Sequence, residues 1–393
     1  MFHSFLKWPI LFWNITSINS NDTYYNKWQV IYSILLMTSC IYNFYITPKT
    51  VCVLEGNCDH SLSTEIKGIF IRIVAISCLI SRLMIFIKGK TQLIQYEKYV
   101  EKMHVITPMT NSEIQILKKI STLLIICCIL LTIPPNSLRV WDLSFRSDFT
   151  MFVYIFMYIQ NLSMYFVETH FVTLCFILYQ KLVGINKDLM ALKIDTVIRN
   201  NYPFMTQTQE KYGKINNTLD YNKDILHSLA TGHPMTDIVE QLKSKHKLVR
   251  DAVRTLNDLF GVHMGLSICV LCLCTMFDIY YFIIGILSLS NYKRIFYLWI
   301  LQYTVRFGSI TIISHLTTKQ ANKSKILITD INNRYLDYNI KDELLLFFDQ
   351  MCNSEFEFTA CDFFSLNSRL ITSTVAAGTS YLIILLQLHY IKQ

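Results

Sequence analysis

The sequence has few charged residues, few glycines and few prolines. Charged residues make up 16% of the 393 residues and hydrophobic residues 52%, whereas soluble domains carry roughly 25% charged residues. The 11 glycines and 7 prolines do not cluster, which argues against Pro-rich linkers and low-complexity tracts. A chain this apolar must bury a very large core or face lipid. Its apolar runs are too long for ordinary core helices, so we expect contact with membrane lipid.

Common enzyme motifs are also missing. The sequence contains no Gly-x-Gly-x-x-Gly, Walker loop, His-Glu-x-x-His or Gly-x-Ser-x-Gly pattern. We therefore expect neither an enzyme nor a cofactor. The net charge of +8 does not require a nucleic-acid partner, because Lys and Arg accumulate in the cytoplasmic loops of membrane proteins.

The twelve cysteines do not form a disulfide framework, because most lie inside apolar runs, where they behave as small hydrophobes. The spacing of Cys269, Cys272 and Cys274 resembles a metal motif. These residues lie in an uninterrupted apolar run, however, so no metal site is expected. Cys52 and Cys58 differ, since they flank a short polar loop that we place outside the cell, where a local disulfide could join them.

Seven segments are long and apolar enough to cross a bilayer, which takes about 20 residues. They cover residues 28–46, 66–87, 115–134, 149–178, 262–288, 295–317 and 369–388. The third segment is expected to end at Pro134 and Pro135, since proline interrupts helices. The predicted fold class is an all-α membrane protein with seven transmembrane helices and cytoplasmic helical extensions.

The distribution of Lys and Arg predicts the orientation of these helices. With the N-terminus inside, the connecting segments that hold most Lys and Arg are all cytoplasmic, even when the long 179–260 loop is set aside. We therefore expect a cytoplasmic N-terminus and an extracellular C-terminus. That topology is opposite to the G-protein-coupled class, whose Asp-Arg-Tyr and Asn-Pro-x-x-Tyr motifs are also absent at the expected places.

The chain is expected to have two functional parts. Residues 1–317 would form a six-helix, ligand-binding bundle with a cytoplasmic loop at about 179–260, of which about 190–235 is irregular. Residues 318–393 would contain a cytoplasmic anchor helix over 318–350 and the seventh helix. Acidic residues of the anchor helix could pair with the Lys-rich loop. The helix is either simply solvated or takes part in subunit assembly through this packed helical base.

The seventh segment carries a family resemblance. Tyr381 and Gln387 enclose five hydrophobic residues, which resembles the signature of the insect gustatory receptor family: Thr-Tyr, five hydrophobic residues, Gln, Phe. The pattern departs from the signature twice. Ser380 stands directly before Tyr381, with Thr379 one position further away, and Leu388 replaces the final Phe.

This resemblance implies a ligand-gated cation channel in the plasma membrane of chemosensory neurons. It implies a homo- or hetero-tetramer with other gustatory receptor subunits, opened by a small tastant and conducting inorganic cations. Each subunit would contribute its seventh helix to a central pore. Gln387, Ile383, Ile384 and Ser380 share one side of that helix, so we predict that they line the pore. The alternative for Gln387 is an interfacial position near the helix end.

The predicted topology places aromatic and polar residues in the outer halves of several spans. The candidate ligand-binding residues are Tyr154, Tyr158, Asn161, Tyr165, Arg72, Asp278, Tyr281, Trp299, Gln302 and Tyr303. Aromatic walls with a few polar groups suit a small molecule, although bilayer preference alone also enriches aromatics at interfaces. Arg72 and Asp278 need a partner or water at that depth, so we expect them to pair or to line the pocket. The scarcity of carboxamides and carboxylates favours bitter compounds over sugars.

Other functions remain as alternatives. An insect odorant receptor-type channel has a similar plan. A G-protein-coupled receptor requires the opposite topology, and a secondary transporter is expected to show internal repeats or broken helices, which the sequence does not suggest. Glu168 and His170 face different sides of their helix. We interpret them as polar contacts to neighbouring helices rather than as a proton relay.

Overall fold

The structure, a computed structural model, describes residues 23–55, 62–144, 148–201, 235–283, 290–331, 336–353 and 356–391. Almost all of these residues are helical. The helices are α3 (Thr23–Glu55), α4 (Leu62–Ile106), α5 (Asn111–Ser144), α6 (Asp148–Asn201), α9 (Met235–Ile283), α10 (Ser290–Thr329), α11 (Tyr338–Cys352) and α12 (Ser368–Ile391). A short antiparallel hairpin of β1 (Thr359–Ala360) and β2 (Phe364–Ser365) precedes α12.

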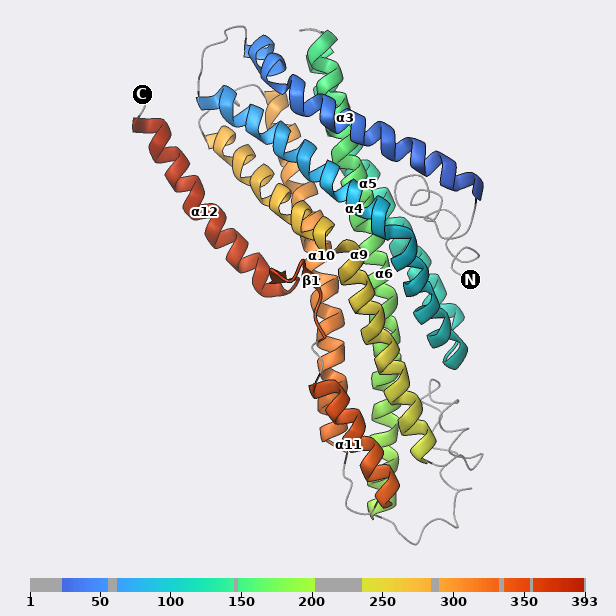
Figure 1. Ribbon diagram of the computed structural model, residues 1–393. Coiled ribbons are helices and arrows are strands. Elements are labelled where there is room, and N and C mark those ends of the chain that lie inside the picture. The colour runs from blue at the N-terminus through green and yellow to red at the C-terminus, as the bar shows by residue number, and fades with distance from the viewer. Residues whose placement is uncertain are drawn as a thin grey trace.

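The helices form an upper bundle and a narrower lower stem (Figure 1). α3, α4, α5, α6, α9 and α10 make the bundle, and the continuations of α6, α9 and α10 make the stem together with α11. Each of the seven predicted spans overlaps one long helix. Among the described residues, six helices are long and apolar enough to cross a membrane: α3, α4, α5, α6, α9 and α12. The remaining helix that overlaps a predicted span is α10, which carries Gln302 and Arg306 within that span.

α6 is the central helix of the molecule. Most of its apolar stretch is buried, and it contributes to a hydrophobic core that extends from the bundle into the stem. The ring of Phe171 lies 5.6 Å from that of Phe260 on α9 and 5.9 Å from that of Phe358, which precedes β1. These rings connect the centre of the bundle to the segment that leads into α12.

Ion pairs join the helices of the stem. The ammonium nitrogen of Lys243 lies 2.5 Å from a carboxylate oxygen of Glu343, which connects α9 to α11. Lys193 and Asp330 approach to 2.9 Å and connect α6 to the residue that directly follows α10. The predicted pairing of acidic residues therefore applies to Glu343 and Asp330.

Two helix boundaries on the N-terminal side differ from the prediction. α5 continues through Pro134 and Pro135 to Ser144. Membrane helices tolerate proline when neighbouring helices support the interrupted turn, and here Thr132 and Asn136, on either side of the proline pair, hydrogen-bond to α10. α4 also extends to Ile106, although the prediction ended its span at residue 87.

Two further boundaries differ in the stem. The region predicted to be irregular from about residue 190 is helical as far as Asn201, with Leu192 buried in the core, and the rest of that region lies outside the described residues. The single helix expected over 318–350 is in fact two helices. α10 runs through residue 318 to Thr329, and α11 begins at Tyr338. α11 has its own apolar face, formed by Ile340, Leu344, Phe347 and Met351, and it buries that face against the stem.

The predicted disulfide lies outside the described residues. Cys52 falls within α3, but its side chain is not described, and Cys58 lies between the described segments. The disulfide stays a prediction.

Candidate functional site

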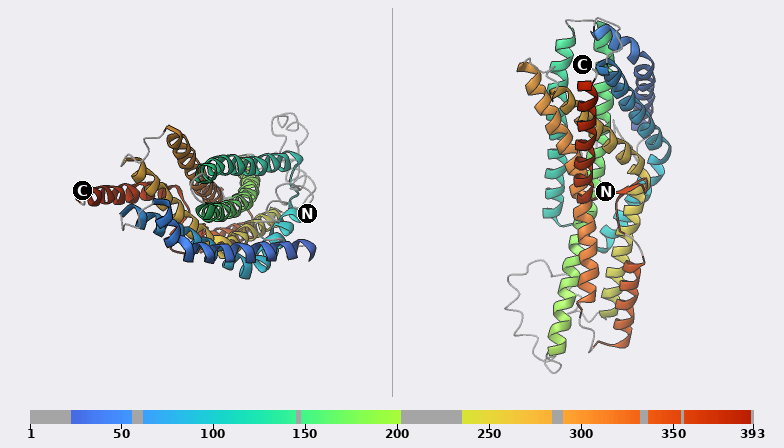
Figure 2. Two further views of the ribbon diagram at one scale, coloured as in Figure 1. Left: turned by 90° about the horizontal axis from the view of Figure 1, so that it is seen from above. Right: turned by 90° about the vertical axis from the view of Figure 1, so that its left-hand side faces the viewer.

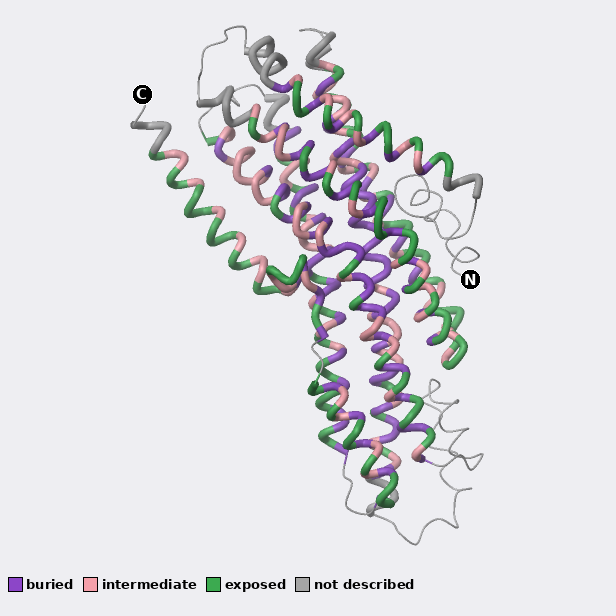
Figure 3. The backbone as a smooth tube through the Cα atoms, viewed as in Figure 1, coloured by how far each residue is buried: buried purple, intermediate pink, exposed green. Residues whose placement is uncertain are grey.

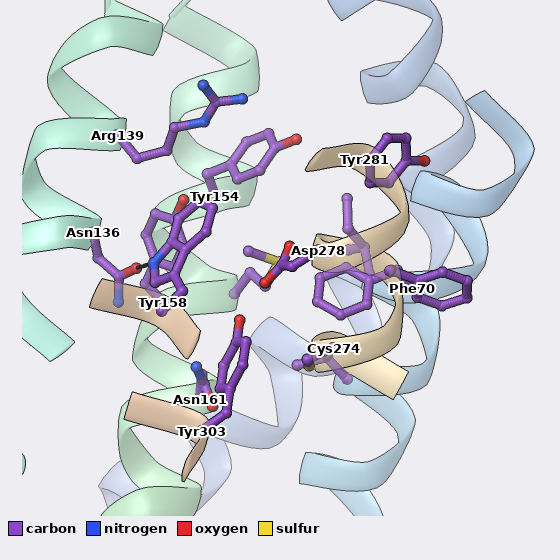
Figure 4. A pocket seen from close by; sticks show the side chains of 15 residues that line it. Phe70, Asn136, Arg139, Tyr154, Tyr158, Asn161, Cys274, Asp278, Tyr281 and Tyr303 are labelled. Atoms are coloured by element: carbon purple, nitrogen blue, oxygen red, sulfur yellow. Dashed lines mark hydrogen bonds between the residues drawn. The ribbon is translucent and has the colours of Figure 1, made fainter. Parts of the chain in front are cut away.

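A cavity of about 140 Å³ lies in the upper bundle, between α4, α5, α6, α9 and α10. Aromatic side chains dominate its walls, and a few polar groups converge on it (Figure 4). Its lining residues are Phe70, Ile71, Val74, Asn136, Arg139, Tyr154, Met157, Tyr158, Asn161, Cys274, Phe277, Asp278, Tyr281, Trp299 and Tyr303. An apolar cavity with few polar groups is the usual form of a small-molecule site.

Most of the predicted ligand-binding residues line this cavity. They are Tyr154, Tyr158, Asn161, Asp278, Tyr281, Trp299 and Tyr303. Residues of α6, α9 and α10 that are far apart in sequence therefore meet at one place. Their role in binding a ligand stays a prediction.

Three predicted residues do not line the cavity. The guanidinium carbon of Arg72 lies 5.7 Å from the ring centroid of Phe44, and the structure shows no ion pair between Arg72 and Asp278. Tyr165 is buried in the core. Gln302 donates a hydrogen bond of 3.1 Å to Thr132 and so joins α10 to α5. All three belong to helix packing. Tyr165 lies on the same side of α6 as Asn161 but one turn deeper, against Arg306.

A buried ion pair lies just beneath the cavity. Arg306 on α10 binds Glu168 on α6 through two hydrogen bonds, of 2.8 and 2.6 Å, and each residue is only 1% exposed. Ser267 on α9 donates a hydrogen bond to the same carboxylate. The Arg306 guanidinium also lies 4.9 Å from the ring centroid of Tyr165. The network joins three helices at the centre of the bundle.

Asn161 connects this ion pair to the cavity. Its side-chain oxygen accepts a hydrogen bond of 2.6 Å from Arg306, and its side chain also lines the cavity. Because the oxygen is held by Arg306, the amide nitrogen is the group that remains to face a ligand. In Figure 4 that nitrogen points upward into the cavity.

Two polar atoms at the cavity lack partners. Trp299 donates a hydrogen bond of 3.3 Å to the side-chain oxygen of Asn136, while the Asn136 amide nitrogen has no hydrogen-bond partner. The Oδ2 atom of Asp278 is buried and also has none. Sequence reasoning missed Asn136 because it follows the proline pair at which we ended the third span. Extending that helix by one turn would have placed it in the bundle.

α12 stands apart from the bundle. It begins next to the other helices and diverges from them towards its C-terminal end (Figures 1 and 2). None of its apolar stretch is buried (Figure 3). Tyr381, Ile383 and Ile384 are 62%, 55% and 49% exposed, and Thr379, Ser380 and Gln387 are exposed as well. The side chain of Leu388 lies outside the described residues.

Comparison with known proteins identifies the family. Residues 66–392 match the 7tm chemosensory receptor family. The chain belongs to that family. The chemosensory receptor is 25% identical over 171 residues to "Putative gustatory receptor 28b" of Drosophila melanogaster, a match that covers 41% of the receptor and 36% of that protein. It is also 25% identical over 169 residues to "Gustatory receptor for sugar taste 43a" of the same species, covering 42% of the receptor and 39% of that protein.

The fold of the receptor resembles that of solved insect olfactory receptors. The olfactory receptor OR5 from Machilis hrabei superposes with a TM-score of 0.65 and 10% identity, over 98% of both chains. Its complex with eugenol gives a TM-score of 0.68 and 12% identity, also over 98% of both chains. At this identity the likeness concerns the fold alone. It confirms the predicted seven-helix, all-α membrane architecture, and the family match confirms the predicted resemblance.

Proposed function

We propose that this receptor is a subunit of a gustatory ligand-gated, non-selective cation channel in the plasma membrane of chemosensory neurons. The observation that carries the proposal is α12, which is apolar enough to span a membrane and has none of its apolar stretch buried in the single chain. An apolar helix that its own chain leaves uncovered needs lipid or other chains around it. Four copies assembled through α12 would enclose a central pore.

The exposed residues of α12 suit that role. Ser380, Ile383, Ile384 and Gln387 share one side of the helix and are exposed in the single chain. In a tetramer, Ile383 and Ile384 would form an apolar constriction beside a ring of Gln387 carboxamides. Apolar constrictions gate by dewetting, and neutral polar rings admit hydrated cations.

The cavity is the proposed site for the tastant. It lies between α4 and α9 on one side and α5, α6 and α10 on the other (Figure 4), so a ligand would contact both groups of helices. α9 also contacts the hairpin that leads into α12, which provides a route from the cavity to the pore. The aromatic walls favour apolar bitter compounds over sugars. An odorant-gated channel is the second candidate, supported by the full-length fold similarity to OR5.

The pore assignment is tested by changing the charge of the proposed ring. We expect Gln387→Lys to abolish cation current, because four lysines would present a positive barrier to cations. The measurement is patch-clamp recording from cells that express the full chain and are exposed to a panel of bitter compounds, sugars and odorants. The matched control is Leu385→Ala, since Leu385 lies on the opposite side of α12 and should leave ion selectivity unchanged.

The same recordings identify a failed proposal. Surface-expressed Gln387→Lys protein with normal cation permeability would show that α12 does not line the pore. Responses to odorants alone would favour the second candidate over the gustatory one.

A further inference from the structure

We propose that the cavity binds a small protonated amine that carries an aromatic or alicyclic ring, with Asp278 as its counter-ion. This inference rests on the proposed function, because it names the chemical class of ligand for the same cavity. It concerns the charge of the ligand, which neither the family nor the fold similarity specifies.

Asp278 supplies the first argument. It lies on α9 at the centre of the lining residues (Figure 4), and its buried Oδ2 atom has no hydrogen-bond partner. A buried carboxylate oxygen that lacks a partner at membrane depth is costly and marks a functional site. The Tyr303 phenol beside it can satisfy only part of its hydrogen-bonding capacity. An ammonium group would supply both the opposite charge and the missing donors.

The rings around Asp278 supply the second argument. Tyr154 and Tyr158 lie with their ring centroids 6.1 Å apart and line the cavity together with Tyr281 and Trp299. The negative faces of aromatic rings attract cations, most strongly where water is excluded. The same rings offer an apolar surface to the body of the ligand, so a hydrophobic amine matches both properties of the wall.

The nearby positive charges do not favour an acidic ligand. The Arg306 charge is already neutralised by Glu168, and Arg306 also donates a hydrogen bond to Asn161. Arg139 also lines the cavity, but its guanidinium lies at the upper edge, above Tyr154 and apart from Asp278 (Figure 4), and it has an interaction of its own. Asp278 is therefore the charged side chain in the middle of the cavity (Figure 4).

The size of the cavity limits the ligand. At about 140 Å³ it is close to an engineered protein cavity of about 150 Å³ that holds benzene. One ring with a short side chain fits such a space. Suitable probes are therefore 2-phenylethylamine, its neutral analogue 2-phenylethanol, and the acid 3-phenylpropionate, which share a ring and differ mainly in charge.

The test measures binding of these three probes to the purified full chain in lipid nanodiscs by calorimetry. We expect the amine to bind at least about tenfold more tightly than the alcohol, the scale of one charge-assisted hydrogen bond. Asp278→Asn should lower amine affinity by about tenfold or more and leave alcohol affinity unchanged. The control is Asp258→Asn, the same change at an exposed position of α9, which should alter neither.

Several results would overturn the inference. These are equal affinity for amine and alcohol, preference for the acid, or an equal loss of both affinities in Asp278→Asn. If Asp278→Asn does not fold, the comparison of the three probes on the unaltered chain still decides, and Asp278→Glu should retain the amine preference. Binding does not require conduction. Amine binding without a current from any tested compound would contradict the proposed channel and leave the present inference intact. Currents evoked by neutral compounds, with no preference for the amine in binding, would contradict only the present inference.

Discussion

Glu168 and Arg306 form an ion pair in the buried interior of the bundle, where either charge without the other would be unfavourable. Both are almost completely buried, and Ser267 and Asn161 complete their hydrogen bonds. Removing one member of such a pair leaves an uncompensated charge in the bundle, which costs far more than the pair contributes. Because Asn161 also lines the cavity, the pair holds part of the candidate site in place.

We expect Glu168→Ala to destabilise the protein by about 3–5 kcal/mol. The reason is that Arg306 would be left buried beneath the cavity without its counter-ion. The measurement is the thermal unfolding midpoint of purified protein in detergent, together with its surface expression.

The control replaces both charges. Glu168→Leu combined with Arg306→Met should recover most of the lost stability, because the two apolar side chains leave no buried charge. If the single and double variants were equally unstable, packing rather than charge would explain the effect of the single change.

At the scale of elements, the close approach of α9 to the β1–β2 hairpin determines where α12 begins. A Cβ atom added to Gly261 would lie 3.2 Å from the backbone nitrogen of Cys361 and 3.5 Å from the carbonyl oxygen of Thr359. Cys361 and Asp362 adopt positive φ angles of 52° and 59°, so the turn is already in a conformation that is unfavourable for these residues. The contact between α9 and the hairpin therefore leaves no room for a larger side chain at position 261.

Gly261→Val should displace the hairpin and lower stability by about 1–3 kcal/mol, the usual cost of overpacking. The thermal unfolding midpoint gives the stability, and the tastant dose–response curve shows whether displacement of the hairpin reaches α12. Gly265→Ala is the matched control. Its added Cβ would lie 3.6 Å from the Ala360 Cβ, which is ordinary contact, so we expect near-normal stability. Similar behaviour of the two variants would exclude the close approach as the cause.

At the scale of the whole molecule, the two ends of the long axis differ in chemistry. The stem is joined by ion pairs such as Lys243–Glu343, whereas the upper bundle exposes large apolar side chains on several helices. Charged stems suit the cytoplasm and apolar exteriors suit lipid. The C-terminal end of α12 points away from the stem (Figure 1), so a cytoplasmic stem would place that end outside the cell.

An epitope tag placed after Gln393 should therefore be stained on intact cells. The same tag placed before Met1 should be stained only after permeabilisation, as expected from the distribution of Lys and Arg. Staining of both tags on intact cells, or of neither in protein shown independently to be at the surface, would contradict the orientation and with it the proposed position of the cavity.

The number of long helices, the family signature and the aromatic character of the site were all predictable from the sequence. These features depend on apolar length, helical spacing and short motifs, which are local along the chain. Seven predicted spans overlap seven helices. Tyr154, Tyr158 and Asn161, which share one side of α6, line the cavity, whereas Tyr165, the next residue on that side, does not. The family match over residues 66–392 agrees with the signature around Tyr381 and Gln387.

Only the tertiary structure decided which polar residues meet. Arg306 binds Glu168, which is 138 positions away in the sequence, while Arg72 and Gln302 leave the predicted site for helix packing. The continuation of α5 through Pro134 and Pro135 is likewise supported from another helix. Hydrophobic periodicity indicates that a helix exists but constrains its rotation only loosely when lipid and core are both apolar. The contacts of each polar side chain therefore depend on neighbours that are distant in sequence.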